Sequence, residues 1–283
     1  MKILVTGATG QLGSLVVEEL LKLVPAEQIA VSVRDPKKAE HLAARGIDVR
    51  AADFNDYDSV VKAFAGADRV LIISTNDLAN RIRQHTNAVN AAKEAGVQFI
   101  AYTSAPNAAS SPLLLAESHK QTEEAILGTG IPYAFLRNNW YLENEMGTFR
   151  AVLNGAPWVI ASEQGKVGWA LRRDYAEAAA RVLAGQGHEN KIYELGGKLR
   201  TQEELSQIFA SVTGRAVQVQ YVDEATYSGI LEQTGMPKPV ADAFAKVQTQ
   251  IGEGALEVDG SDLDRLLGRA PTPPEDGIRA LLN

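Results

Sequence analysis

The chain has 283 residues, of which 45% are hydrophobic and 22% are charged, as in an ordinary soluble globular enzyme. Its formal net charge of −7 at pH 7 argues against a nucleic acid or an anionic membrane surface as the main partner. The sequence contains no cysteine, which excludes disulfides, thiolate catalysis and cysteine-ligated zinc, and no metal site is predicted.

The first predicted elements are an apolar strand at residues 2–6, a glycine-rich turn and a helix at residues 12–23. Gly7, Gly10 and Gly13 are spaced G-x-x-G-x-x-G rather than the usual G-x-G-x-x-G, but the mechanics are the same. The first glycine permits a tight exit from the strand, the second lets the backbone approach a pyrophosphate, and the third lets the helix lie close to the sheet. The helix N-terminus then offers free N–H groups to phosphates. This order predicts a dinucleotide-binding βαβ unit, with an ordinary glycine turn as the alternative.

The residue after the second predicted strand, residues 28–33 (QIAVSV), bears on the choice of cofactor. A dinucleotide fold normally has an acid about 20 residues beyond the glycines, where it binds the ribose 2′-hydroxyl. This sequence has Arg34 there, followed by Lys37 and Lys38. A guanidinium can bind the 2′-phosphate of NADP(H) with two hydrogen bonds. We therefore predict NADP(H) rather than NAD(H), although Asp35 weakens the inference and a solvated loop arginine is the alternative.

The next two strands add further candidate cofactor contacts. A third strand is predicted at residues 47–51, after a helix at residues 36–45, and Asp53 follows its carboxyl end, where open α/β sheets bind ligands. We interpret Asp53 either as an acceptor for the adenine amino group or as the N-cap of the following turn. The fourth strand, residues 69–74, is apolar enough to be covered on both faces, and Ser74 at its end is expected over the cofactor.

The fifth strand, residues 97–103, follows a helix at residues 80–95, and Thr103 ends it beside the expected nicotinamide position. Five strands that alternate with helices in about 100 residues predict a doubly wound parallel sheet, which is an α/β Rossmann fold. A helix at residues 117–127 and a sixth strand at residues 131–136 continue the pattern.

The rest of the chain is less regular and is predicted to form a smaller C-terminal α/β lobe. Helices are predicted at residues 173–183, 201–212, 223–254 (with breaks), 263–267 and 277–282, and strands at residues 191–195 and 217–222. The helix at 201 begins with a Thr-x-x-Glu capping box. We assign residues 1–150 to an NADP-binding Rossmann domain and residues 151–283 to a substrate lobe, with some strands and helices returning to the Rossmann domain.

The usual acid of short-chain dehydrogenases, the tyrosine of Tyr-x-x-x-Lys, is missing. Tyr133 is followed four residues later by Arg137, but on a strand the two lie about 13 Å apart. His119 and Glu123 stand on one face of the helix after the fifth strand. We interpret them either as a His⁺–Glu⁻ dyad near the nicotinamide or as an exposed ion pair that contributes roughly a few tenths of a kcal/mol. His119 is kept as a candidate catalytic or pocket-lining residue.

Lack of this acid favours a particular kind of electron acceptor. A ketone becomes an alkoxide and needs a proton donor in place. A quinone becomes a phenolate-like anion whose conjugate acid has a pKa near about 10, so water can protonate it. Hydride transfer then depends on proximity and orientation, with the nicotinamide supplying the chemistry. Trp140 and Tyr141 after the sixth strand are candidates to stack on a flat ring, or are packing residues, and Asn138 or Asn139 is a candidate to bind a quinone oxygen.

The motifs together resemble those of the NmrA-like atypical short-chain dehydrogenases over nearly the whole chain. The segments that carry the resemblance are TGATGQLG, VRDPKKA, ADFND, AGVQFIAYTS and TGIPYAFLRNNWYLEN. Within the family the chain is most similar to bacterial type 2 NADPH-dependent quinone oxidoreductases, with triphenylmethane reductase as a near relative. The segment Ala105-Pro106-Asn107 departs from the pattern, so this loop leaves open a different acceptor.

The resemblance also implies a set of site residues. In the glycine turn, NADPH would contact Gly7, Thr9, Gly10, Gln11 and Leu12. Elsewhere, Arg34 would bind the 2′-phosphate, Asp53 would lie near adenine, Ser74 and Thr103 would flank the ribose and nicotinamide, and Asn139 with Tyr141 would face the substrate.

Three functions are compatible with these observations. The first is reduction of a small quinone-like molecule by NADPH, the second is an NADP-binding redox sensor of the NmrA type without turnover, and the third is a triphenylmethane-dye or azo reductase. We expect a monomer or homodimer that binds no nucleic acid and no membrane, since no apolar run approaches the roughly 20 residues of a membrane span. A cytoplasmic location is expected because the first strand leaves no room for a cleaved signal peptide.

Overall fold

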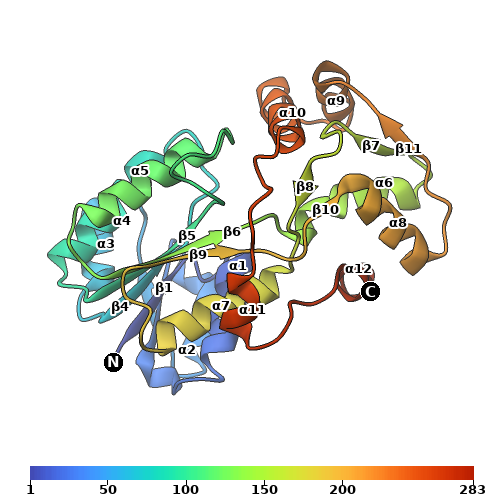
Figure 1. Cartoon of the computed structure of the whole chain (residues 1–283). Helices are drawn as coiled ribbons and strands as arrows, with labels where there is room; N and C mark the ends of the chain where they lie inside the picture. Colours follow the sequence, from blue (N-terminus) through green and yellow to red (C-terminus); the bar gives the residue numbers. More distant parts are fainter.

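The computed structural model describes residues 1–283, and its largest element is a parallel sheet of seven strands (Figure 1). The strand order is β3-β2-β1-β4-β5-β6-β9. The strands are β1 (Ile3–Thr6), β2 (Ile29–Val33), β3 (Asp48–Ala51), β4 (Arg69–Ile72), β5 (Phe99–Ser104), β6 (Tyr133–Asn138) and β9 (Lys191–Leu195). The order reverses between β1 and β4, and doubly wound sheets bind ligands at such a reversal. The predicted α/β Rossmann fold is confirmed.

Helices cover both faces of this sheet. One layer contains α1 (Gln11–Leu20), α2 (Glu40–Ala43), α7 (Arg172–Ala184) and α11 (Asp262–Leu267), and the other contains α3 (Tyr57–Phe64), α4 (Arg81–Glu94) and α5 (Ala116–Leu127). Along β1, Ile3 and Val5 face the first layer and Leu4 faces the second, and all three are fully buried. Burial on both faces explains why the strands are continuous apolar runs rather than alternating ones.

The remaining elements form a smaller lobe beside the sheet (Figure 1). It contains the 3₁₀ helix η3 (Leu142–Glu145), α6 (Met146–Leu153), β7 (Trp158–Ile160), β8 (Lys166–Val167), β10 (Arg200–Thr201), α8 (Gln202–Thr213), β11 (Val219–Tyr221), α9 (Glu224–Gln233), α10 (Lys238–Gly252) and α12 (Pro274–Leu282). Strand β7 pairs with β11, and β8 pairs with β10. The lobe has its own core, in which the rings of Phe149 and Phe209 stack with centroids 5.0 Å apart beside Trp158.

Three elements of the C-terminal half lie with the nucleotide-binding half. Strand β9 pairs with β6, α7 packs along α1, and α11 packs on α7. The two halves are therefore interleaved in sequence, and the boundary at residue 150 stays a prediction.

Several local features differ from the sequence-based expectation. The helix expected at residues 36–45 is a 3₁₀ helix, η2 (Pro36–Ala39), followed by the short α2; another 3₁₀ helix, η1 (Ala26–Gln28), precedes β2. The side chain of Asp35 caps η2 by accepting a hydrogen bond from Lys37 N, and this local bond fixes the tight turn. The capping box at Thr201 and Glu204 is confirmed. None of the helices combines the length and the apolar character that crossing a membrane requires.

Candidate cofactor and substrate site

The glycine turn forms a cradle at the start of α1. Gly7 has a φ of +62°, in the left-handed region that favours glycine, and Gly10 N donates to Gly7 O. A Cβ on Gly13 would lie 2.3 Å from Gly7 O, so only glycine allows α1 to approach the turn this closely. Gly10 is the N-cap of α1, with no side-chain cap and no acidic residue in the first turn. The helix N-terminus therefore keeps its N–H groups and positive dipole end free for an anion.

The other turn residues predicted to bind the cofactor differ in exposure. Thr9 and Gln11 are exposed, whereas Leu12 is 7% exposed and packs in the core. Leu12 can therefore offer a ligand its backbone N–H but not its side chain. The cradle fits the pyrophosphate of a dinucleotide, although the individual contacts stay predictions.

Arg34, predicted to bind the 2′-phosphate, is exposed just after β2 and has no carboxylate partner. Asp35 caps η2, so its side chain is used locally. Asp53 follows β3 and is half-buried, and its Oδ1 accepts hydrogen bonds from the backbone N and the side-chain Nδ2 of Asn55. That turn-capping role matches the alternative interpretation of Asp53, while contact with adenine stays a prediction.

Ser74 and Thr103 are brought together at the carboxyl ends of β4 and β5. Ser74 N donates to Thr103 Oγ1 at 2.9 Å, and Thr103 Oγ1 donates to Ser74 Oγ at 3.4 Å. On the other side of β4, Ile73 N donates to Thr6 Oγ1. Side-chain hydroxyls thus tie the ends of β1, β4 and β5 together at the point of strand-order reversal. Their contacts with ribose and nicotinamide stay predictions.

The predicted pairing of His119 with Glu123 is wrong. The two side chains are 6% and 5% exposed, and each bonds to a strand residue rather than to the other. His119 Nδ1 lies 2.8 Å from the hydroxyl of Tyr102 on β5. Glu123 forms a two-pronged ion pair with Arg137 on β6, at 2.6 and 2.9 Å. Their common face of α5 is turned onto the sheet, which neither interpretation of the spacing foresaw.

His119 belongs to a buried polar cluster with His85 of α4, and both imidazoles are neutral. Burial, reinforced by the nearby Arg81 guanidinium, lowers the pKa of each histidine to about 3. Thr75 N donates to His85 Nε2, so the proton of His85 is assigned to Nδ1, which lies 2.9 Å from Thr122 Oγ1. A histidinium at His119 is therefore not available at neutral pH, and its role in catalysis stays a prediction.

The buried histidines should make the protein less stable in mild acid. Unfolding returns their pKa from about 3 to near 6.5, so the unfolded chain binds more protons and stability falls as pH drops through that window. His119→Gln should make the dependence of unfolding free energy on pH shallower, by about 1.4 kcal/mol per pH unit around pH 5. Urea titrations at several pH values measure this slope. His41→Gln, at an exposed position of α2, is the control, and equal slopes in the wild type and His119→Gln would contradict the assignment.

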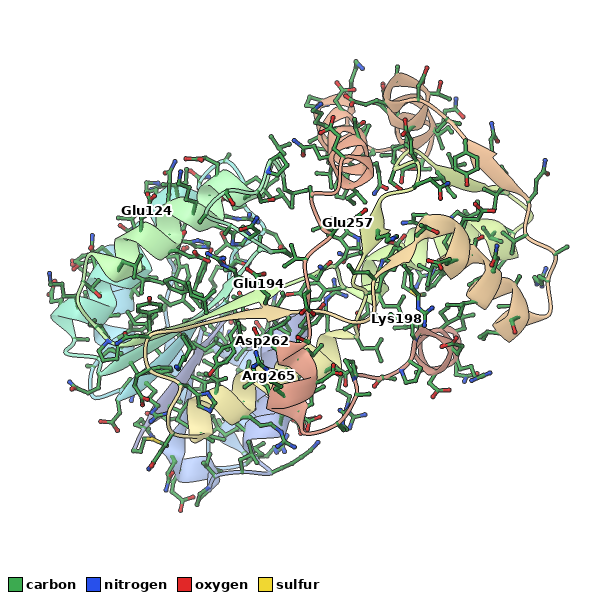
Figure 2. The ribbon with its side chains drawn as sticks, viewed as in Figure 1. Glu124, Glu194, Lys198, Glu257, Asp262 and Arg265 are labelled. Atoms are coloured by element: carbon green, nitrogen blue, oxygen red, sulfur yellow. The ribbon has the colours of Figure 1, made fainter.

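A buried ion-pair network closes the sheet at β5, β6 and β9. Arg137 lies between Glu123 and Glu194, at 2.6 and 2.9 Å, and Ser104 Oγ donates to Glu123. Burial raises the pKa of Glu194, and its hydrogen bond with Arg137 opposes that rise. Glu194 lies on β9, and its backbone N donates to Asp262 of α11 (Figure 2). Sequence reasoning missed this network, for which the only signal was a charge at the end of an apolar strand.

The polar residues after β6 hold this segment in place. Asn139 is 5% exposed; its Oδ1 accepts from Trp140 N and Gly168 N, and its Nδ2 donates to Leu256 O. Its amide is therefore used on three backbone segments, and contact with substrate stays a prediction. The neighbouring Asn138 donates through Nδ2 to the Tyr141 hydroxyl, while its buried Oδ1 has no partner.

Tyr141 is half-buried and packs against the core formed by the sheet, α1 and α7. The guanidinium of Arg172 lies 4.6 Å from the centre of its ring, and the ring of Tyr175 meets it edge-on at 5.3 Å. Burial raises the pKa of Tyr141, so its hydroxyl keeps its proton at neutral pH. The ring of Tyr141 therefore contacts Arg172 and Tyr175, and its contact with substrate stays a prediction.

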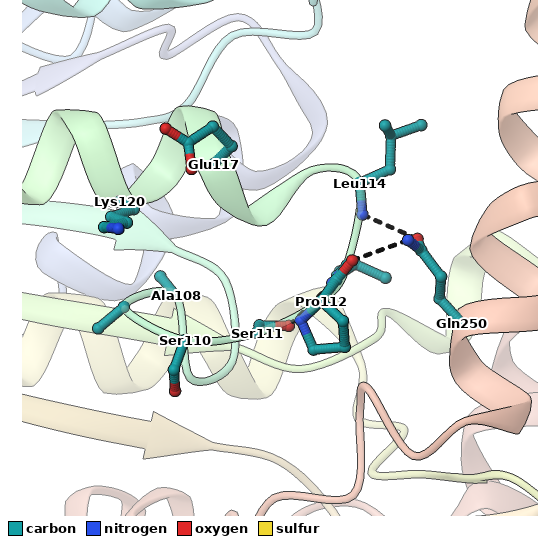
Figure 3. Close-up of a pocket in the computed structure, with 10 residues that line it drawn as sticks. Ala108, Ser110, Ser111, Pro112, Leu114, Glu117, Lys120 and Gln250 are labelled. Atoms are coloured by element: carbon teal, nitrogen blue, oxygen red, sulfur yellow. Dashed lines mark hydrogen bonds between the residues drawn. The ribbon is translucent and has the colours of Figure 1, made fainter.

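The segment 105–115 after β5 is fastened at two places. Asn107, with a φ of +47°, donates its backbone N–H to the carboxylate of Glu194. Farther along, Gln250 of α10 accepts from Leu114 N at 2.8 Å and donates to Pro112 O at 2.7 Å (Figure 3). A cavity of about 470 Å³ lies between this segment, the beginning of α5 and Gln250. Gln250 thus ties the loop after β5 to the smaller lobe by two hydrogen bonds, and Leu113 of the same loop packs into the core of that lobe.

Comparisons with known proteins find relatives that match nearly the whole chain. The model of the NmrA-like family matches residues 1–269. Quinone oxidoreductase 2 of Escherichia coli (strain K12) is 43% identical over 284 residues, which cover 99% of this chain and 99% of that protein. The crystal structure of NADPH-dependent quinone oxidoreductase from Escherichia coli complexed with NADPH has a TM-score of 0.96 at 42% identity, covering 99% of this chain and 100% of that one. Citrobacter sp. triphenylmethane reductase complexed with NADP(H) has a TM-score of 0.93 at 40% identity, with 99% and 100% covered.

Proposed function

The chain belongs to the NmrA-like family, and on that premise we infer that it is an NADPH-dependent reductase that transfers hydride to a quinone or a similar flat, conjugated acceptor. The similarity to a quinone oxidoreductase extends over 99% of both chains, so it includes the cofactor turn and the lobe alike. The glycine cradle and the uncapped N-terminus of α1 fit a dinucleotide pyrophosphate.

The choice of acceptor rests on the burial of His119, Tyr102 and Tyr141 near the carboxyl ends of β5 and β6, because burial makes these side chains poor proton donors. The pKa of His119 is lowered to about 3, so its ring is neutral at pH 7 and has no imidazolium proton to donate. Burial raises the pKa of Tyr102 and of Tyr141, which makes each a poorer proton donor. A ketone would lack the tyrosine acid of related enzymes, whereas a hydroquinone anion, with a conjugate-acid pKa near about 10, takes its proton from water.

The residues of the chain bind and orient the two reactants. When bound, NADPH supplies the hydride. The free N–H groups of α1 would hold its pyrophosphate, Arg34 its 2′-phosphate, and the hydroxyls of Ser74 and Thr103 would lie near the reactive end. The segment 105–115 and Tyr141 would set the position of the acceptor, because alignment of the reacting atoms is the main requirement for hydride transfer.

The direct test follows NADPH absorbance with the purified protein and benzoquinone or naphthoquinone. Steady turnover with a quinone is expected. Tight binding of NADP(H) without turnover on any acceptor would instead support a redox sensor. Turnover confined to a triphenylmethane or azo dye would support the dye-reductase alternative. The 40% identity to triphenylmethane reductase is the observation that favours this alternative.

Arg34→Ala should change the coenzyme preference. Losing charged hydrogen bonds to a phosphate costs about 1.5–3 kcal/mol, which corresponds to a rise in KM for NADPH of roughly 10- to 150-fold. The KM for NADH should stay within about 2-fold, because NADH lacks the 2′-phosphate. Arg215→Ala, which removes another exposed arginine, is the matched control. Equal changes for the two coenzymes would remove Arg34 from the phosphate site.

A monomeric or homodimeric state and a cytoplasmic location complete the proposal, with a small quinone-like molecule rather than a nucleic acid as the partner. Gel filtration with light scattering distinguishes the two oligomeric states. Fractionation of the producing cells tests the location.

A further inference from the structure

Arg81, the first residue of α4, carries a buried charge without a carboxylate partner. Its side chain is 6% exposed. Arg137 is the other buried arginine, and it forms ion pairs with two carboxylates. Arg81 Nε donates to Thr75 O at 2.8 Å, and Nη1 donates to Ser118 Oγ at 3.3 Å and lies 3.4 Å from His119 Nε2. Its Nη2 has no hydrogen-bond partner in the chain. An arginine stays protonated at neutral pH, so this is a full positive charge among neutral groups.

The titratable groups on the neighbouring elements do not neutralise this charge. His85 of α4 and His119 of α5 are uncharged, because burial and the guanidinium lower both pKa values to about 3. Tyr102 of β5 is neutral as well, since burial raises its pKa.

The nearby carboxylates are used elsewhere. Glu123 of α5 is held by Arg137 and Ser104. Asp77, in the turn before α4, accepts hydrogen bonds from Asn80 and Gln84 and forms no ion pair with Arg81. Burial lowers the pKa of Arg81, because the protein solvates the guanidinium less well than water does.

The guanidinium lies at the edge of the sheet where the reaction is proposed to occur. Thr75 follows Ser74 at the carboxyl end of β4, and Ser74 is bonded to Thr103 at the end of β5. Ser118 lies in the first turn of α5, after the loop from β5. Thr75 also has a buried Oγ1 without a partner. An uncompensated cation and an unpartnered hydroxyl therefore accompany the two hydroxyls expected next to the reactive end of the cofactor.

We propose that Arg81 is the electrostatic group that stabilises the anion formed on the acceptor, and that it selects acceptors which become negative on reduction. This rests on the proposed function. The quinone gains a hydride, which is one proton with two electrons, and NADPH, which loses it, is oxidised to NADP⁺. The resulting hydroquinone monoanion takes one proton from water. A fixed cation in a site with little water lowers the energy of such a developing charge without having to reorganise.

The sign of the charge makes the proposal selective. A neutral quinone becomes an anion when it accepts hydride, so Arg81 favours its reduction. A cationic triphenylmethane dye becomes neutral on accepting hydride, so the same guanidinium disfavours its binding and gains nothing in its transition state. General damage to the site would reduce both reactions, whereas loss of the charge alone should separate them.

The test compares Arg81→Met with the wild type on both acceptors. Quinone kcat should fall roughly 100-fold, in the range found for lost oxyanion donors. Turnover of a cationic dye such as malachite green should stay level or rise, and the Kd for NADPH should change less than about 2-fold. Arg81→Lys, which keeps the charge, should recover most of the quinone activity. Equal losses on quinone and dye, or unchanged quinone turnover in Arg81→Met, would overturn the proposal.

A binding measurement tests the charge without turnover. The anion of 2-hydroxy-1,4-naphthoquinone resembles the charged product, and neutral 1,4-naphthoquinone is the control. Arg81→Met should weaken binding of the anion at least about 10-fold more than binding of the neutral ring. Equal weakening overturns the role of Arg81. Absence of quinone turnover in the wild type, with charge-selective binding retained, would instead count against the proposed enzyme and leave the charge assignment standing.

Discussion

Replacing Gly13 with alanine is expected to abolish NADPH binding and to lower the free energy of unfolding by about 3 kcal/mol or more. A Cβ at this position would lie 2.3 Å from Gly7 O, 2.8 Å from Gly7 C and 2.9 Å from the Cα of Ala8. All three atoms belong to the backbone, so no side chain can rotate away. To make room, α1 must move off the turn, and the N–H groups that are proposed to bind the pyrophosphate move with it. Urea unfolding and a fluorescence titration with NADPH measure the two effects.

Gly147→Ala provides the matched control. Gly147 lies in α6, and nothing comes within 4 Å of the Cβ that alanine would add there. Because alanine is the better helix former, this variant should be more stable by about 0.5–1 kcal/mol and should bind NADPH normally. A stable Gly13→Ala protein with normal NADPH affinity would show that α1 does not need to approach the turn as closely as the structure has it.

Arg137→Met should lower the free energy of unfolding by about 3–5 kcal/mol, the usual cost of removing one partner from a buried ion pair. Glu123 would remain 5% exposed without its counter-ion, and Glu194 would lose its closest cation. Methionine fills a similar volume, so the loss reports the charge rather than a cavity. Denaturant midpoints of the purified variant provide the measurement.

The same variant should recover part of its stability in acid. The pKa of Glu194 is already raised by burial, and removing the opposing Arg137 raises it further. A carboxyl with a raised folded-state pKa stabilises the fold below its unfolded pKa and loses that contribution as pH rises through the folded value. The deficit of Arg137→Met should therefore be larger at pH 8 than at pH 5. Arg279→Met, which removes an exposed pair with Asp276, should cost at most about 1 kcal/mol, and an equal loss in both variants would contradict the argument.

Replacing Arg137 or Arg81 with methionine is expected to have opposite effects on stability. Arg137 neutralises carboxylates, so its removal leaves buried charges behind. Arg81 has no carboxylate to neutralise, so methionine there removes a buried charge outright and should leave the melting temperature level or higher. Comparing the two variants thus separates an arginine that stabilises the fold from one retained for its charge.

Features that depend on local chain chemistry were predictable from the sequence. The strand, glycine turn and helix at the N-terminus follow from backbone geometry that only glycine allows, and the apolar runs reveal strands covered on both faces. Ser74 and Thr103 were expected at neighbouring strand ends, and the structure joins them by hydrogen bonds. The capping box at Thr201 is a purely local signal, and it is confirmed as well.

Features that depend on which elements meet were not predictable. The spacing of His119 and Glu123 says that they share a helix face, but not that this face lies on the sheet, where Tyr102 and Arg137 become their partners. Arg137 and Glu194 are 57 positions apart, and only the pairing of β6 with β9 brings them together. Nothing local in the sequence marks Gln250 as a hydrogen-bond partner of the loop after β5.

The long sequence separation between the paired strands β6 and β9 has a consequence for folding during synthesis. Synthesis of β6 is complete at residue 138, whereas its outer neighbour β9 is complete only at residue 195. Several elements of the smaller lobe are synthesised between the two strands. Until then β6 is an open edge, and Arg137 has only one of its two carboxylates. A fragment ending at residue 150 would keep that edge permanently and should aggregate. We therefore expect that residues 1–150 do not fold as a transferable module, and that grafting them onto another substrate lobe would require that lobe to supply the seventh strand.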